Sequence, residues 1–361
     1  MSENNSLPII TAKNLMVNNS PHIQSKTTIS SIMWEVNLAL LLILIMSVNN
    51  FGIRAFYVVL MSVLGSLAAE FLIQKYMLKK KVTIKDGSAV VTGLLLGFCL
   101  PVAIPLWISF VGGFIAIGLG KQVFGGLGNN IFNPAHVARA ILLASWPVYM
   151  NTWLKPGVKN VLSNVDAITT ATPLTFLKET AKNTELMNQL SNQGVSLVQY
   201  VLNTLDISFA DMFLGLKISG SLGETCKLAI LLGGLFLIIR RHVDWRTPLS
   251  MFVTVFLGAL LISGSLEYAT FHILAGGLFL GAFFMATDMV TSPVTKDGRI
   301  LFGICCGAIT LLIRLKGGYP EGVCYSILIM NAFTPLIDKY IKPRRFGTLP
   351  PKANPNKEAA K

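Results

Sequence analysis

Long apolar runs alternate with short polar segments along almost the whole chain. The runs are roughly 16 to 25 residues long with at most one charge inside each, close to the ~20 residues that a helix needs to cross a ~30 Å hydrocarbon layer. They predict helices near residues 32–48, 54–74, 88–104, 106–120, 135–149, 223–240, 246–263, 270–287, 300–315 and 322–338. We therefore expect an all-α polytopic membrane protein of about ten transmembrane helices.

The composition agrees with that expectation. Of the 361 residues, 53% are hydrophobic and only 13% are charged, and the mean hydropathy is +0.62. A soluble domain carries roughly twice this charged fraction. The net charge of +13 comes mostly from cations between the apolar runs, so it indicates contact with membrane lipid and no nucleic-acid partner.

Lysine and arginine are distributed unevenly between alternate polar segments. With the N-terminus inside, the short outer loops hold only Arg54, Arg314 and Lys316. The cytoplasmic segments hold the other loop cations, namely Lys75, Lys79, Lys80, Lys81, Lys85, Lys121, Arg139, Arg240, Arg241, Arg246, Lys296, Arg299 and the basic tail from Lys339. The positive-inside rule then places both termini in the cytoplasm of a bacterial cell with a multi-pass inner-membrane protein.

This orientation divides the chain into five parts. Residues 1–31 form a cytoplasmic tail that lacks the apolar core of a signal peptide. Residues 32–150 and 223–338 form two five-helix halves, and residues 151–222 form an extracytoplasmic segment between them. Residues 339–361 form a basic cytoplasmic tail.

Two stretches, 120–140 and 286–299, interrupt the helical pattern. Each follows a span with a glycine pair, Gly112–Gly113 or Gly276–Gly277, and each contains Asn-Pro or Ser-Pro before the next apolar run. Backbone that leaves a helix at membrane depth needs partners in protein or water, so we expect two broken or re-entrant segments. Their likeness hints at an internal duplication. The alternative is that glycine and proline only permit close packing and loop entry.

The side chains show no pattern typical of a catalytic or metal site. The histidines are scattered, and neither a Walker loop nor a GxGxxG motif is present, so nucleotide chemistry must take place on another chain. The cysteines lack CxxC spacing, and we expect even the adjacent Cys305 and Cys306 to serve packing. Glu70 lies within helical reach of Lys75, and Asp288 is the best candidate for an ion path.

The predicted outer segment contains the phrase DAITTATPLT at residues 166–175. Taken alone, it predicts a threonine-rich turn in which Thr172 caps a short helix that begins at Pro173. That interpretation requires no cofactor.

The D-x-x-[ST]-x-A-T core of this phrase resembles the flavinylation motif of membrane subunits in the Rnf electron-transport complex and in the Na+-translocating NADH:quinone reductase. The phrases SPHIQSKTTISSIMW, GGLGNNIFNPAHVARA, ATDMVTSPVT and GGYPEGVCYSILIMNAFTPLID match in the same order and extend the resemblance over nearly the whole chain. The chain looks like the D subunits of Rnf complexes, with the B subunits of the quinone reductase closely related. The short terminal tails favour the Rnf side. Thr170 is a departure, because the family generally has Gly or Ser there.

The resemblance implies a covalent FMN, held by a phosphodiester on Thr172 that makes the chain a phosphoprotein. Asp166, Thr169 and Ala171 would complete the motif that the flavin transferase recognises, and Thr169 is a conceivable second acceptor.

The resemblance also implies a non-covalent riboflavin, which we expect in the broken stretch near Asn133, Pro134 and Arg139. The chain would then be an electron-transfer flavoprotein subunit of a ferredoxin:NAD+ oxidoreductase that transports Na+ or H+, and would not catalyse the overall reaction alone. Its expected partners are the Rnf subunits A, B, C, E and G, above all the flavin-bearing G protein of that set. Ferredoxin and NAD would act through other subunits.

Two hypotheses from other classes compete with the flavoprotein. A secondary transporter or permease is the main one, because many spans with broken segments near proline are typical of transporters. A structural anchor for partner subunits is the other. Neither predicts a tethered flavin, so the presence of one separates all three.

Overall fold

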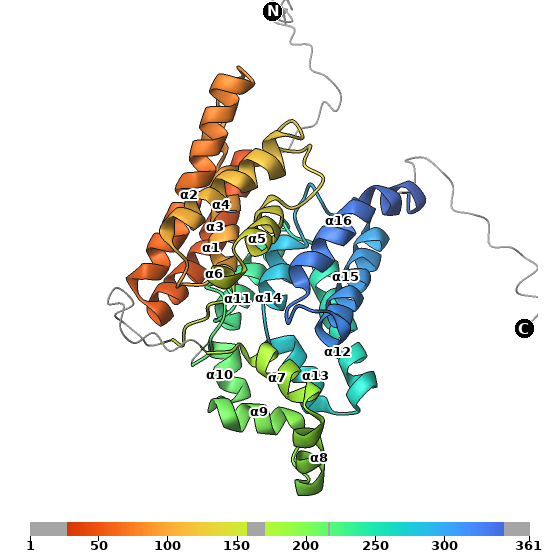
Figure 1. Cartoon of the computed structure of the whole chain (residues 1–361). Helices are drawn as coiled ribbons and strands as arrows, with labels where there is room; N and C mark the ends of the chain where they lie inside the picture. Colours follow the sequence, from red (N-terminus) through yellow and green to blue (C-terminus); the bar gives the residue numbers. More distant parts are fainter. Residues whose placement is uncertain (1–26, 157–169, 216, 343–361) are drawn as a thin grey trace, which may run out of the picture.

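The computed structural model describes residues 27–156, 170–215 and 217–342. Within these ranges every regular element is a helix, which confirms the all-α prediction. The helices form an N-terminal group, a C-terminal group and a smaller group at one end of the molecule (Figure 1).

The N-terminal group contains five helices. They are α1 (Ile29–Phe51), α2 (Ile53–Leu72), α3 (Ser88–Cys99), α4 (Leu106–Ile117) and α5 (Pro134–Ser145). α1 and α2 are separated by Gly52, whose φ of 77° lies in the left-handed region that glycine adopts without strain. α2 and α4 continue into π-helical turns, η2 (Ile73–Met77) and η4 (Gly118–Gln122).

The C-terminal group contains the remaining long helices. They are α11 (Lys227–Ile239), α12 (Arg246–Ser263), α13 (Leu266–Leu274), α14 (Leu278–Leu280) with its π-helical extension η5 (Gly281–Met285), α15 (Lys296–Lys316) and α16 (Val323–Tyr340). α12 packs along α15, and α15 packs along α16. Figure 1 shows α15 and α16 on the side of the molecule away from α1 to α4.

A short helix, α6 (Pro147–Met150), leads out of the N-terminal group. The segment that follows contains α7 (Pro173–Lys182), α8 (Thr184–Gln193), α9 (Leu197–Leu205) and α10 (Phe209–Leu214), which gather at one end of the molecule (Figure 1). Leu174, Leu177 and Val201 share a small core with Phe271 of α13. This separate core fixes the group to the rest of the chain.

Four helices among the described residues are long and apolar enough to cross a membrane: Ile29–Phe51, Ile53–Met77, Arg246–Ser263 and Lys296–Lys316. The pair formed by α13 and Leu278–Met285 is bent by 66° and makes a fifth if counted as one span. Three shorter apolar helices are α3, α4 with its extension, and α11. The chain is therefore a multi-pass membrane protein, while the number of ten spans stays a prediction.

Prolines shorten two of the predicted helices. The helix predicted over 88–104 ends at Cys99, because Pro101 cannot donate the next backbone hydrogen bond. The helix predicted over 135–149 is interrupted at Trp146, which adopts φ −131° and ψ 60° immediately before Pro147. Both boundaries were wrong because apolar character continues past the point where helix geometry ends.

The helix predicted over 270–287 is broken at its glycine pair. α13 ends at Leu274, and the chain turns through Gly276, whose φ is 71°, before α14 begins. A β-carbon there would face the Arg314 and Glu321 side chains. The break is therefore occupied by polar groups from other helices, as irregular backbone at membrane depth requires.

Three cations that the sequence assigned to loops are buried instead. Lys121 is 2% exposed and Arg314 is 3% exposed, and the Arg139 side chain is 13% exposed. Their assignment to surface loops was wrong, because each pairs with groups inside the protein. These three cations therefore carry no information on orientation, and the placement of the termini rests on the remaining loop cations as a prediction.

Glycine allows α2 and α4 to cross closely. A β-carbon at Gly65 would lie 2.0 Å from the carbonyl oxygen of Phe110, and one at Gly113 would lie 2.1 Å from that of Ser62. Ser109 Oγ of α4 donates to the Val58 carbonyl of α2 at 2.6 Å. Small residues at a helix crossing with hydroxyl-to-backbone bonds are the usual means of association inside a membrane.

Candidate functional site

Thr172 lies at the start of α7. Its Oγ1 accepts a hydrogen bond from the backbone N–H of Thr175 at 3.2 Å and lies 2.8 Å from Thr175 Oγ1. Pro173 occupies the first helical position. This arrangement confirms the predicted helix with its threonine cap. Asp166 and Thr169, the other polar residues of the motif, lie outside the described residues.

The backbone just before Thr172 is fixed on both sides. The N–H of Thr170 donates to the Trp153 carbonyl at 3.1 Å. The hydroxyl of Ser219 donates to the Ala171 carbonyl at 2.9 Å. The segment that carries Thr172 is therefore held between the chain that leaves α6 and the chain that follows α10.

Lys178 fixes the middle of α7 to the end of α15. Its Nζ donates to the carbonyls of Gly317 at 2.5 Å and Tyr319 at 2.8 Å. Partial burial, with a smaller contribution from Lys182, lowers the pKa of the Lys178 amine. The helix that begins at Thr172 thus has a defined position relative to the C-terminal group.

A pocket with about 290 Å³ of empty volume opens beside Thr172. We call it the threonine pocket; its walls include Thr172, Pro173, Ser219, Glu224, Lys227 and Gly276. The first residues of α7 and of α11, Pro173 and Lys227, both line it. Two helix N-termini therefore face one small space, and each contributes free N–H groups and the positive end of a helix dipole.

Charged side chains gather behind this pocket. We call them the charge cluster: Arg139, Glu224, Lys227, Arg314 and Glu321. Arg139 Nη2 lies 2.6 Å from Glu321 Oε2 and 3.8 Å from Glu224 Oε1. Lys227 is 1% exposed and Glu224 is 8% exposed. So many charges at one buried place are expensive unless they compensate each other.

The charge cluster also satisfies the broken helix. Arg314 donates to the carbonyls of His272 and Ala275 at the C-terminal end of α13. Glu321 accepts from the N–H of Gly277 at the N-terminal end of α14. A cation at a helix C-terminus and an anion at a helix N-terminus each complement the local dipole. The break therefore depends on these charges.

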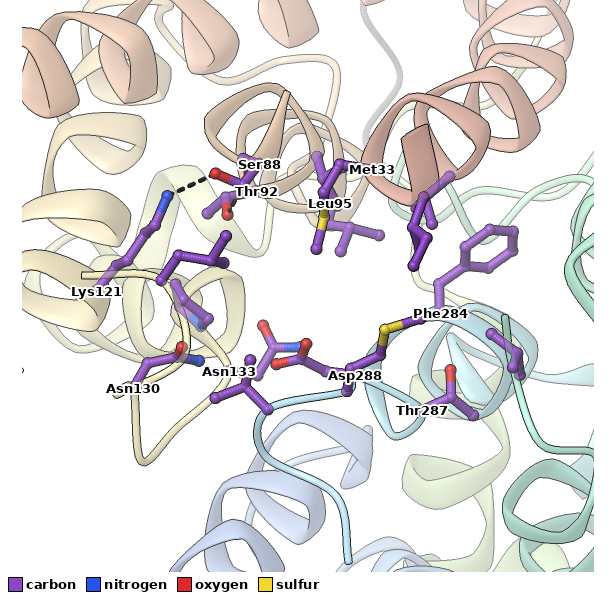
Figure 2. A pocket seen from close by; sticks show the side chains of 18 of the residues that line it. Met33, Ser88, Thr92, Leu95, Lys121, Asn130, Asn133, Phe284, Thr287 and Asp288 are labelled. Atoms are coloured by element: carbon purple, nitrogen blue, oxygen red, sulfur yellow. Dashed lines mark hydrogen bonds between the residues drawn. The ribbon is translucent and has the colours of Figure 1, made fainter. Parts of the chain in front are cut away.

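A second pocket, with about 780 Å³ of empty volume, lies where the two predicted broken stretches meet (Figure 2). We call it the Asn133 pocket. Figure 2 shows Asn130, Asn133 and Asp288 together on one wall, with Met33, Leu95 and Phe284 on the apolar walls. Asn133 Nδ2 donates to the Met285 carbonyl at 3.2 Å, which joins the first stretch to the second.

The structure separates the residues that the sequence had grouped for riboflavin. Asn133 and Pro134 line the Asn133 pocket, and so does Asp288. Arg139 does not; it lines a different pocket beside Glu321. Only the first two residues of the predicted group share a pocket, together with Asp288, the candidate for the ion path.

Lys121 and Glu70 form a buried ion pair at the edge of the Asn133 pocket. Lys121 Nζ lies 2.8 Å from Glu70 Oε1 and 2.7 Å from Ser88 Oγ. The expected pairing of Glu70 with Lys75 is wrong, because the Lys75 ammonium lies over the Phe71 ring at 5.0 Å. Glu70 faces the protein interior, and a partner from the end of α4 reaches it there.

Sequence reasoning missed the charge cluster and the Lys121–Glu70 pair. Arg139 and Glu321 are 182 positions apart, and Lys121 and Glu70 are 51 apart. The available signal was that Lys227 and Arg314 stand directly beside long apolar runs, where a charge is costly without a partner. Among the described residues, no three His, Cys, Asp or Glu side chains are arranged to hold a metal ion.

Comparison with known proteins follows from the same sequence. A model of the NQR2, RnfD, RnfE family matches residues 16–347. The chain is 47% identical over 336 residues to the D subunit of the proton-translocating ferredoxin:NAD(+) oxidoreductase complex of Clostridium ljungdahlii, covering 92% of this chain and 96% of that protein. It is 45% identical over 335 residues to the D subunit of the Na(+)-translocating complex of Acetobacterium woodii, covering 92% and 96%. It is 38% identical over 333 residues to the D subunit of the ion-translocating oxidoreductase complex of Stutzerimonas stutzeri, covering 89% and 93%.

Proposed function

Because this chain belongs to the NQR2, RnfD, RnfE family, we propose that it is the D subunit of an ion-translocating ferredoxin:NAD+ oxidoreductase (Rnf) complex and carries FMN covalently on Thr172. In this role it relays electrons within the complex. The overall reaction takes place on several chains, since no nucleotide-binding motif is evident in this one.

The placement of Thr172 is the observation that carries the proposal. Its hydroxyl lies at the N-terminus of α7 and lines a pocket onto which the N-terminus of α11 also opens. Phosphate groups bind favourably at helix N-termini, because free N–H groups and the helix dipole both attract an anion. The residues therefore fit a phosphodiester at this oxygen.

The tether forms without net oxidation or reduction. The Thr172 hydroxyl loses its proton, and its oxygen bonds to the phosphorus of a flavin nucleotide while the bond from phosphorus to the leaving group breaks. A flavin dinucleotide donor with AMP as leaving group balances this step. When bound, the flavin supplies electron transfer, and the chain supplies its position and electrostatic surroundings.

We assign the non-covalent riboflavin to the Asn133 pocket. Its empty volume of about 780 Å³ falls within the range of ~300–1,000 Å³ that is usual for small-molecule sites. Apolar walls with a few amide and hydroxyl groups, from Asn130, Asn133 and Thr287, suit a flat heteroaromatic ring with a polar edge. Arg139 lies elsewhere and is not part of this assignment.

α11 connects the two pockets, which supports a relay between them. Lys227 at its start lines the threonine pocket, and Leu237 near its end lines the Asn133 pocket. These residues are separated by about 15 Å of helix rise. Two flavins placed in this way would be separated along the membrane normal by part of the bilayer thickness.

The proposal also names partners and an ion. The chain would exchange electrons with the flavin-bearing G protein of the complex and assemble with the A, B, C and E proteins, while ferredoxin and NAD act through other chains. Ion movement, of Na+ or H+, is a property of the whole complex. Asp288 is our candidate for a contribution from this chain, because it is the carboxylate that lines the Asn133 pocket.

Fluorescence of the denatured chain tests the tether. The chain is produced together with the flavin transferase, denatured, separated on a gel and viewed under ultraviolet light. We expect a fluorescent band for the wild type, none for Thr172→Ala, and an unchanged band for Thr184→Ala, an exposed threonine of α8 in the same segment. The flavin released on denaturation reports the second assignment, and Asn133→Leu should reduce it without dimming the band.

Three results would contradict the proposal. A dark wild-type band would leave the permease or the structural anchor, neither of which needs a flavin. An equally bright Thr172→Ala band would move the acceptor to another residue, of which Thr169 is the first to test. Equal dimming in Thr184→Ala would show that the segment, rather than the Thr172 oxygen, is required.

A further inference from the structure

Lys227 is a fully buried cation at the first position of α11. It is 1% exposed, and the preceding residue, Cys226, provides no side-chain cap for the helix. Burial of an ammonium group in apolar surroundings costs several kcal/mol unless it is paired, so such groups nearly always have a partner. The partner of Lys227 is therefore worth identifying.

Within the described part of the chain, no acceptor lies within hydrogen-bond or ion-pair distance of Lys227 Nζ. Glu224 lines the same pocket, yet its close cation is Arg139, at 3.8 Å from Oε1. Lys227 lines the threonine pocket. An ammonium with three donors thus borders a space that also contains the Thr172 hydroxyl.

The charges of the cluster do not balance. Arg139, Lys227 and Arg314 are three cations, whereas Glu224 and Glu321 are two carboxylates, so one positive charge is left over. His272, the other titratable side chain beside Arg314, is neutral at pH 7 when buried without a carboxylate partner. A single negative charge in the threonine pocket would neutralise the cluster.

A phosphodiester on Thr172 supplies that charge at this position. Its phosphorus is bonded directly to Thr172 Oγ1, so its two free oxygens must lie against the Thr172 wall of the pocket. It carries one negative charge at neutral pH. The N–H groups at the start of α11 face the same space and have no side-chain cap, so they add donors to those of Lys227.

We propose that Lys227 and the N-terminus of α11 bind the phosphodiester of the nucleotide that is attached to Thr172. This proposal rests on the proposed function and adds a positioning residue to it. Lys227 fixes the tether at its phosphate, and it thereby limits the orientations of the flavin relative to the rest of the chain. Free inorganic phosphate is the other source of the same chemistry.

A thermodynamic cycle tests the pairing in the full-length chain. The chain is purified in detergent with and without co-production of the flavin transferase, as wild type and as the variants Lys227→Gln, Lys227→Arg and Lys182→Gln. Lys182 is an exposed cation in the last turn of α7 and serves as the matched control. The thermal unfolding midpoint of each form is measured, together with the fluorescence anisotropy of the attached flavin.

We expect attachment of FMN to raise the midpoint of the wild type, Lys227→Arg and Lys182→Gln. In Lys227→Gln the rise should be lost, and the attached flavin should show lower anisotropy. Unmodified Lys227→Gln should unfold at a higher temperature than the unmodified wild type, because it no longer buries an unpaired charge. A Lys227 that served only the fold would give the opposite order for the unmodified pair.

Inorganic phosphate distinguishes the two sources. Phosphate should raise the midpoint of the unmodified wild type and leave the modified wild type unchanged, because the tethered group then fills the site. An equal effect on both forms would overturn the proposal, and so would an undiminished gain on modification of Lys227→Gln. Failure of the wild type to acquire FMN is a different result, which contradicts the proposed function itself. Should Lys227→Gln fail to fold, the anisotropy and phosphate response of Lys227→Arg against Lys182→Gln decide: a response altered only in Lys227→Arg supports the site, and identical responses count against it.

Discussion

At the scale of single residues, charges that the sequence presents as loop residues are partners inside the protein. Lys121 reaches Glu70 at 2.8 Å with both side chains at most 2% exposed. Glu70 Oε1 also accepts from the side-chain amides of Gln74 at 3.1 Å and Gln122 at 3.2 Å. A carboxylate with three donors on one oxygen is held firmly, and its neighbour in the Asn133 pocket is placed with it.

Loss of one partner of this pair should cost more than loss of both. Lys121→Met leaves the Glu70 carboxylate buried without its cation, at a cost of about 3–5 kcal/mol in the free energy of unfolding. The double variant Lys121→Met, Glu70→Gln keeps a neutral acceptor for the two glutamines and should recover most of this loss. Thermal unfolding of the purified chains measures both. Lys75→Met, which alters an exposed cation, is the control, and an equal loss in Lys75→Met and Lys121→Met would refute the pair.

At the scale of elements, the close crossing of α2 and α4 and the break between α13 and α14 shape the membrane domain. The crossing needs Gly65 and Gly113 because backbone from the partner helix occupies the place of a β-carbon. The break needs Arg314 and Glu321 because free carbonyl and N–H groups at membrane depth have no water. One device is steric and the other is electrostatic.

An added methyl group should therefore separate two glycines of neighbouring position. Gly113→Ala places a β-carbon 2.1 Å from the Ser62 carbonyl oxygen and forces α2 and α4 apart, which should cost about 1–3 kcal/mol. Gly118→Ala, one turn and a half later, would meet only the Ile73 side chain at 3.5 Å. We expect a lower unfolding temperature for the first variant and little change for the second. Similar midpoints for the two would show that the crossing is not close-packed.

At the scale of the whole molecule, the outer segment and the membrane domain are joined around Thr172. The helices α7 to α10 lie at one end of the molecule (Figure 1), and α11 runs from the threonine pocket to the Asn133 pocket. A relay across the bilayer requires these two pockets to face opposite sides of the membrane. The orientation predicted from the loop cations gives that result.

Cysteine labelling of intact cells tests this orientation. Glu185 of α8 and Lys80, between η2 and α3, are both exposed, so a cysteine at either position is open to a reagent. A membrane-impermeant maleimide should label Glu185→Cys on intact spheroplasts and Lys80→Cys only after permeabilisation. The parent chain corrects for its own cysteines, of which only Cys305 is not buried. The reverse pattern would invert the predicted topology.

The sequence predicted what depends on neighbouring positions and missed what depends on distant ones. The apolar runs located the long helices, and the Thr-Pro step located the start of α7, because period and capping are local properties. The pairing of Arg139 with Glu321 was out of reach, because apolar periodicity does not identify a partner 182 positions away. The threonine pocket required the structure for the same reason, since Thr172, Glu224 and Gly276 come from three separate segments.

The measurement that bears most directly on the central claim is tandem mass spectrometry of the chain isolated from the cell that naturally produces it. The peptide that contains Thr172 should be heavier by one FMN less one water, and fragmentation should place that mass on Thr172. If this peptide is found only at its unmodified mass in an active complex, the chain does not carry a tethered flavin, and the account of Thr172 as the attachment site is wrong.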